Sequence, residues 1–136
     1  MEIVERAETQ LSSDATASSA ARAFLRATLE TWELDGFGEV TELLTSELVS
    51  NVVRHVGSPM TVRALRHPTR IRVEVDDLST QRPTLQRPGP LEEGGRRGIL
   101  LVDSLADKWG TEMRDRGKTV WFEIDVRTAT AEVHTT

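Results

Sequence analysis

The run Arg70–Asp76 alternates polar and apolar residues without a break, which is the period of a half-buried strand. A chain with such a strand must build a sheet and cover one of its faces. If the strand continues one residue further, Asp77 falls on the covered side and Asp76 faces solvent. A carboxylate at this strand end is placed to accept a hydrogen bond from an exocyclic amine such as that of adenine. A turn aspartate that bonds its own backbone is the alternative.

Two hairpins are predicted, one of which contains this strand, and helical spacing appears in three segments. The strands are expected at 2–11, 60–66, 70–77, 108–114 and 118–126, and the helices after Ser12–Asp14, up to about Val56, and over 99–106. This order predicts an α+β fold: a two-layer sandwich whose sheet is mixed but mostly antiparallel, with helices on one face.

The helix that ends near Val56 carries polar residues on its apolar side. Glu47, Asn51 and His55 recur every four residues beside Leu44 and Leu48. Burying such groups without partners costs roughly 1–3 kcal/mol each. The apolar side is therefore expected to open onto a ligand, a metal or a wet cavity. A satisfied buried network is the alternative.

A glycine cluster at 94–98 precedes the last predicted helix and contains Arg96 and Arg97. A glycine loop that leads into a helix start offers free N–H groups and the positive end of the helix dipole, which suits an anion. The cluster lacks the P-loop pattern, and a flexible loop is the alternative.

The order of these motifs resembles the GHKL ATP-binding superfamily, which includes gyrase-type ATPases and histidine-kinase catalytic domains. Within it, the chain looks most like the stand-alone anti-sigma-factor serine kinases of bacteria. The resemblance rests on four segments that together span about residues 15–126: Glu47–His55, Val73–Asp77, Gly94–Val102 and Gly117–Ile124.

The resemblance implies ATP and Mg²⁺ as cofactors and a role for each matching residue. Glu47 would be the general base, Asn51 the magnesium ligand, and Asp77 the acceptor for the adenine amine. The remaining implied nucleotide contacts are His55, Gly95, Arg97, Gly98, Ile99, Leu100 and Thr119.

The chain also departs from the superfamily pattern. Ser79 and Gln81 stand where most members have glycine, and Lys118 stands where many have threonine. The predicted lid between Asp77 and Gly94 holds three of the five prolines, so a helix is not expected there.

Length, net charge and cysteine content limit the functions that this protein can have. With 136 residues, one domain is expected over 1–126, followed by a flexible tail at 127–136. The net charge of −5 disfavours direct nucleic-acid or anionic-membrane binding. The absence of cysteine and of a long apolar run predicts a cytoplasmic protein without disulfides or a membrane span.

The leading hypothesis is an ATP-dependent serine/threonine kinase that binds a sigma factor and phosphorylates a serine of a small antagonist protein; the resemblance also suggests a homodimer. The first alternative is a catalytically weak or inactive nucleotide-binding module that sequesters its regulatory partner. The second is a detached histidine-kinase catalytic domain, although no phosphoacceptor helix accompanies it in this chain.

Overall fold

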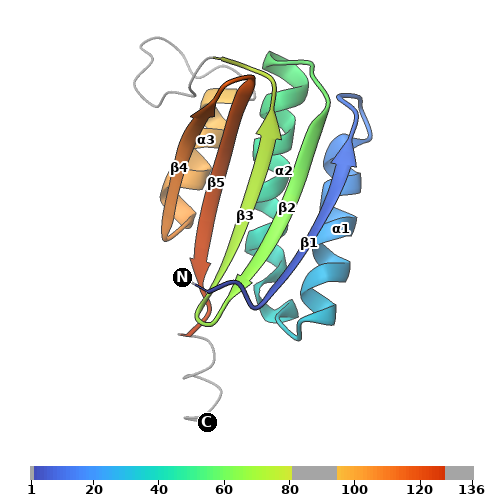
Figure 1. The fold of residues 1–136 in the computed structure, drawn as a ribbon. Coiled ribbons are helices and arrows are strands. Elements are labelled where there is room, and N and C mark those ends of the chain that lie inside the picture. The colour runs from blue at the N-terminus through green and yellow to red at the C-terminus, as the bar shows by residue number, and fades with distance from the viewer. Residues whose placement is uncertain (1, 81–94, 128–136) are drawn as a thin grey trace.

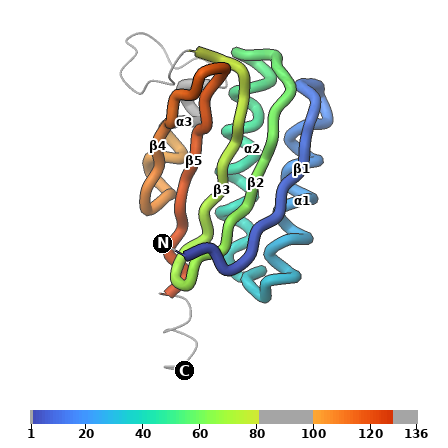
Figure 2. The backbone as a smooth tube through the Cα atoms, in the orientation of Figure 1, coloured from blue at the N-terminus to red at the C-terminus, as the bar shows by residue number. Residues whose placement is uncertain are grey.

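The computed structural model describes residues 2–80 and 95–127, with the backbone alone described at 95–99. These residues form a five-stranded sheet in the order β1-β2-β3-β5-β4, with helices covering one face (Figures 1 and 2). The elements are β1 Glu5–Leu11, α1 Ala17–Thr31, a 3-10 turn Asp35–Phe37, α2 Gly38–His55, β2 Met60–His67, β3 Arg70–Asp77, α3 Gly95–Leu105, β4 Lys108–Arg114 and β5 Gly117–Asp125. Within this part of the chain, no helix is both long and apolar enough to cross a membrane.

The predicted α+β sandwich with helices on one face is confirmed, with one correction to the sheet. Every strand pair in the described residues is antiparallel, so the sheet is not mixed. The proposed lid at 81–94 and most of the predicted tail lie outside the described residues.

Two predicted helix starts differ from the structure. Helix α1 begins at Ala17, because the Asp14 carboxylate accepts hydrogen bonds from the Thr16 N–H and hydroxyl and so closes a turn before the helix. The glycine cluster was expected as a loop, but from Gly95 onward it forms the first turn of α3. Glycine lowers helix propensity without forbidding a helix, and the helix that forms buries Val102 in the core.

The core lies between the sheet and the helices. Ile71, Val73 and Val75 of β3 are buried, as their alternation predicts, and so is Phe122 of β5. The helices contribute the buried apolar residues Ala17, Ala21, Leu25, Leu29, Leu44, Leu48, Val49, Val52 and Val102. This packing fixes which face of β3 and β5 meets the helices.

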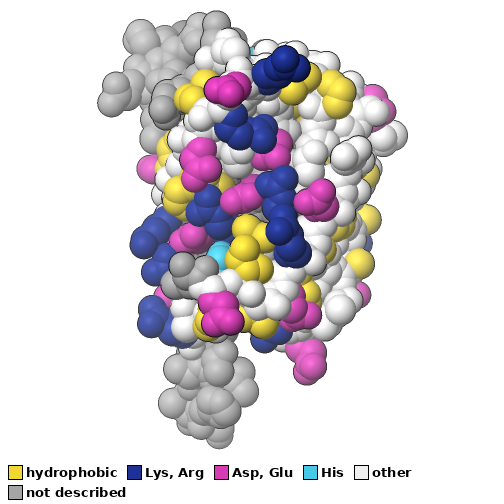
Figure 3. Space-filling model, viewed as in Figure 1, with side chains coloured by type: hydrophobic (Ala, Val, Ile, Leu, Met, Phe, Trp, Pro, Cys, Tyr) yellow, Lys and Arg dark blue, Asp and Glu magenta, His cyan; other side chains and the backbone are white. Residues whose placement is uncertain are grey.

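The other face of the sheet is open and carries intermixed arginines and carboxylates (Figure 3). Arg63 of β2 donates to Asp76 over 2.9 Å, and Arg72 of β3 donates to Glu123 over 3.1 Å. Asp76 was expected to face solvent, yet it is only 9% exposed. The predicted face is correct, but the expected exposure is wrong because Arg63 and the Thr119 hydroxyl bond to its carboxylate.

The ion pairs on the open face predict a specific pH dependence. Burial alone would raise the pKa of Glu123, but hydrogen bonds from Arg70 and Arg72 outweigh burial and hold this pKa below its ordinary value of 4.5. Because the folded pKa is the lower one, the Glu123 carboxylate contributes stability above pH 4.5, and this contribution is lost as pH falls through the folded pKa.

Glu123→Gln should therefore reduce the free energy of unfolding at pH 7, with the difference from wild type shrinking in acid. Urea denaturation at pH 7 and at about pH 3 measures both values. Glu112→Gln is the control, since the Glu112 side chain is 61% exposed and lies 3.5 Å from Arg72. An equal deficit at both pH values would contradict the assignment.

Gly117, the first residue of β5, is required by the backbone. Its φ is 144°, and a Cβ at this position would overlap the carbonyl oxygen of Asp77. Gly117→Ala should therefore lower the free energy of unfolding by roughly 1–3 kcal/mol, as measured by denaturant titration. Gly36→Ala should change stability little, since its Cβ would meet nothing within 4 Å.

Candidate functional site

Four elements bring the predicted site residues to one end of the molecule. The last turns of α2, the end of β3, the start of α3 and the start of β5 all lie there (Figure 1). This arrangement follows from the antiparallel topology, in which α2 and β3 both run toward this end while α3 and β5 start from it (Figure 2).

Helix α2 supplies the polar residues that the sequence singles out. Glu47 and Asn51 are half-buried and one helical turn apart, and His55 is exposed at the last residue of the helix. The side-chain oxygen of Asn51 is buried and has no hydrogen-bond partner among the described residues.

This orphaned amide oxygen fits a ligand-binding role. A buried acceptor without a partner is unfavourable by roughly 1–3 kcal/mol, so native proteins rarely retain one without a reason. A neutral oxygen is a suitable ligand for a hard cation such as Mg²⁺. Within the described residues, no group of three or more histidines and carboxylates could hold a metal ion. A magnesium ion at Asn51 would therefore depend on the phosphates of a nucleotide for further ligands.

Asp77 of β3 lies on the helix-covered face, as its position in the alternation predicts, and it is 2% exposed. Its Oδ1 accepts a hydrogen bond from the Ser79 N–H over 2.7 Å, as a turn aspartate would. Its Oδ2 accepts one from the Lys118 ammonium, also over 2.7 Å. A carboxylate can accept about four hydrogen bonds, so both roles leave room for a further donor.

Lys118 is the partner of Asp77, and the motifs did not predict this pairing. It faces Asp77 across the β3–β5 pair, and its side chain is only 7% exposed. The signal was available, because Lys118 shares strand parity with Val120 and Phe122, which face the helices. Two buried, opposite charges on one face of neighbouring strands are expected to pair.

Thr119 lies on the opposite face of the sheet from Asp77. Its hydroxyl donates to Asp76 Oδ1 over 2.7 Å, and its side chain is buried among the open-face charges. The structure therefore does not bring Thr119 together with Asn51 and Asp77, and the expected nucleotide contact is not supported by its position.

The predicted phosphate-binding residues fall in the first turns of α3. The backbone of Gly95, Gly98 and Ile99 belongs to this helix, while the side chains at 95–99, including Arg97, are outside the description. Leu100 is half-buried. Because the helix starts at the end where Asp77 lies, its N-terminal N–H groups and dipole favour an anion there.

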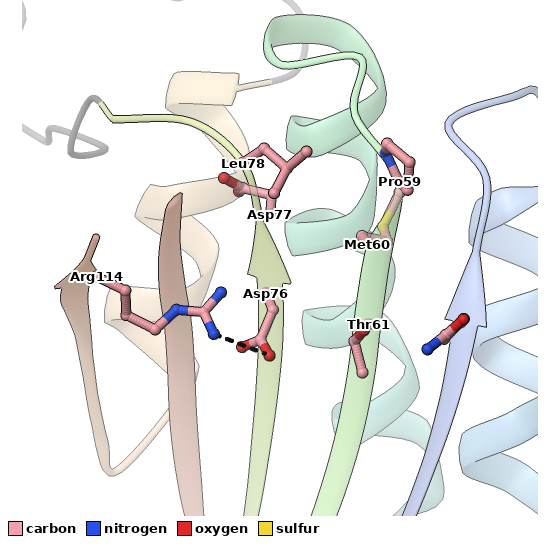
Figure 4. Close-up of a pocket in the computed structure, with 8 residues that line it drawn as sticks. Pro59, Met60, Thr61, Asp76, Asp77, Leu78 and Arg114 are labelled. Atoms are coloured by element: carbon pink, nitrogen blue, oxygen red, sulfur yellow. Dashed lines mark ion pairs between the residues drawn. The ribbon is translucent and has the colours of Figure 1, made fainter. Parts of the chain in front are cut away.

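A hollow of about 320 Å³ at the same end opens on the other face of the sheet (Figure 4). Thr61 and Asp76 line it on this face, Asp77 and Leu78 line it at the end of β3, and Arg114 closes one side with its Nη1 3.6 Å from Asp76 Oδ2. The Asp76 carboxylate already bonds Arg63 and Thr119. We assign the candidate nucleotide site to the helix-covered face, because the unpartnered oxygen of Asn51 and the start of α3 lie there beside Asp77.

Comparison with known sequences identifies the family. The family model of the histidine kinase-like ATPase domain matches residues 11–124. An uncharacterized protein of Streptomyces coelicolor is 36% identical over 99 residues, which cover 63% of this chain and 92% of that protein.

Solved structures share the fold at low sequence identity. The RsbU and RsbW domains of a Mycobacterium tuberculosis protein match with a TM-score of 0.64 and 19% identity, over 89% of this chain and 32% of that one. The histidine kinase domain of a blue-light activated kinase from Erythrobacter litoralis matches with a TM-score of 0.51 and 21% identity, over 69% of this chain and 46% of that one. The chain thus spans less than half the length of either solved chain. From the family match and the shared fold, we conclude that this chain belongs to the histidine kinase-like ATPase domain family, the GHKL superfamily that its motifs resemble.

Proposed function

We propose that the protein binds ATP with Mg²⁺ at the Asn51–Asp77 end of the sheet and phosphorylates a serine of a small antagonist protein. In another state it would bind a sigma factor, as anti-sigma-factor serine kinases do, and it would act as a cytoplasmic homodimer. The observation that carries the proposal is the buried, unpartnered oxygen of Asn51 at the same end as the buried carboxylate of Asp77. Membership of an ATPase family makes ATP the expected ligand.

Each residue would have a distinct task. Asp77 would accept the adenine amine, and the first turns of α3 would hold phosphate oxygens through backbone N–H groups. Asn51 would be the protein's ligand to Mg²⁺, which supplies charge neutralisation at the phosphates when bound. Glu47, one helical turn from Asn51, would take the proton from the attacking serine hydroxyl. His55 and Arg97 remain proposed contacts near the phosphates.

Nucleotide titration tests the binding half of the proposal. Wild-type protein should bind ATP more tightly with Mg²⁺ than with EDTA, and Asn51→Ala should remove most of that difference. The reason is that the variant lacks the amide oxygen that holds the ion. Ser50→Ala is the control, since the Ser50 hydroxyl lies 3.0 Å from the Ser18 hydroxyl, at the junction with α1. The absence of ATP binding to the wild type would reject the proposed site.

The test of the proposed kinase activity requires the antagonist protein as substrate. Incubation of the protein with ATP, Mg²⁺ and the antagonist should yield phosphoserine on the antagonist, detected by mass spectrometry. Intact ATP binding without phosphoserine would reject the kinase and leave the alternative of a binding module that sequesters its partner.

A further inference from the structure

The buried ion pair at the end of β3 contains more hydrogen-bonding capacity than the protein uses. The Lys118 side chain is 7% exposed and the Asp77 side chain 1% exposed. Lys118 has three N–H donors. Within residues 2–80 and 95–127, the only acceptor recorded for these donors is Asp77.

The backbone also holds these strand ends together through contacts that do not involve the lysine side chain. Gly117 already brings the backbone of β5 against the Asp77 carbonyl, and the Ser79 N–H already holds the Asp77 carboxylate. A buried ion pair is often no more stabilising than an apolar pair of similar volume. Unused donors of a buried ammonium are also unfavourable unless water or a ligand accepts from them. The combination indicates a ligand-facing role for Lys118.

The pair presents an acceptor and a donor side by side. The Asp77 Oδ2 and Lys118 Nζ atoms are 2.7 Å apart. The Watson–Crick edge of adenine likewise carries a donor, the N6 amine, next to an acceptor, ring atom N1. We propose that Lys118 determines base specificity by donating a hydrogen bond to N1 of adenine while Asp77 accepts one from N6. This inference rests on the proposed function, because it assumes that adenine binds at Asp77.

Two consequences follow from this arrangement. Guanine has its acceptor and donor in the reverse order on the same edge, so O6 would face the carboxylate and the N1 hydrogen would face the ammonium. Both contacts would then be repulsive, which strengthens the discrimination against guanine nucleotides. The lysine also cancels the charge of Asp77 and so reduces the repulsion between this carboxylate and the phosphates of a bound nucleotide.

Nucleotide analogues test the proposal on the unaltered protein. Wild type should bind 1-deaza-ATP, which keeps the N6 amine but has a C–H at position 1, about tenfold or more weakly than ATP. The matched control is 7-deaza-ATP, which is altered away from this edge and should bind like ATP. Equal affinity for ATP and 1-deaza-ATP would overturn the proposal. No binding of any of the three would instead reject the proposed function.

A lysine variant completes the test. Lys118→Met should bind ATP about tenfold or more weakly than wild type, should no longer distinguish ATP from 1-deaza-ATP, and should show a smaller preference for ATP over GTP. Lys108→Met, at the exposed position that holds the other lysine of the chain, should leave all these ratios unchanged. If Lys118→Met binds ATP as tightly as wild type or more tightly, the lysine does not read the base. If this variant does not fold, the analogue series on wild type decides the proposal.

Discussion

Replacing Glu47 with glutamine is expected to slow phosphoryl transfer to the antagonist by about 100- to 10,000-fold, the usual contribution of a general base. Glutamine keeps the size and hydrogen-bonding reach of the side chain but cannot accept the proton of the attacking serine. Glu47 is half-buried and lies one helical turn from Asn51, but it is not one of the proposed nucleotide or magnesium contacts. The substitution should therefore leave ATP affinity nearly unchanged. Single-turnover transfer rates and ATP titration measure the two effects separately.

Glu39→Gln provides the matched control for this experiment. Glu39 lies in the first turn of the same helix, is exposed, and is two turns from Glu47. Its substitution should therefore preserve the transfer rate. A Glu47→Gln protein that transfers phosphate at the wild-type rate would exclude Glu47 as the base. A matching loss of ATP affinity would indicate a binding role.

The second large effect concerns stability. Lys118→Met leaves the Asp77 carboxylate buried without its charge partner, which is expected to lower the free energy of unfolding by about 3–5 kcal/mol. In a domain of this size such a loss is a large part of the total stability. Urea denaturation at pH 7 in the absence of nucleotide measures it, with Lys108→Met as the exposed control.

The double variant Asp77→Asn with Lys118→Met separates charge burial from packing. Removing both charges should recover most of the stability that the single variant loses, since the penalty arises from one unpaired charge. A double variant as unstable as the single one would show that the lysine contributes through its packing instead.

Much of the candidate site follows from strand periodicity. The alternation through Arg70–Asp76 placed Asp77 on the covered face, and the structure confirms this because the core residues of β3 point the same way. The two hairpins and the helix that carries Asn51 were also predicted correctly, since their turns and apolar spacing are local properties.

The sequence-based predictions that failed or were not made concern contacts between residues far apart in the chain. The burial of Asp76 depends on Arg63 from the neighbouring strand, and no local pattern reveals that an arginine will lie over it. The pairing of Lys118 with Asp77 requires the register of β3 against β5. The assignment of Thr119 to the site followed the family motif, whereas strand parity places its hydroxyl on the open face.

The two aspartates at the end of β3 have a consequence for how the sheet assembles. Asp77 meets Lys118 on one face, and Asp76 meets Thr119 on the other. If β5 slipped by a single residue against β3, the ammonium would move to the wrong face and the buried carboxylate would lose its cation. Misaligned pairing is thus penalised by charge as well as by misplaced apolar residues, which favours a single alignment of these two strands during folding.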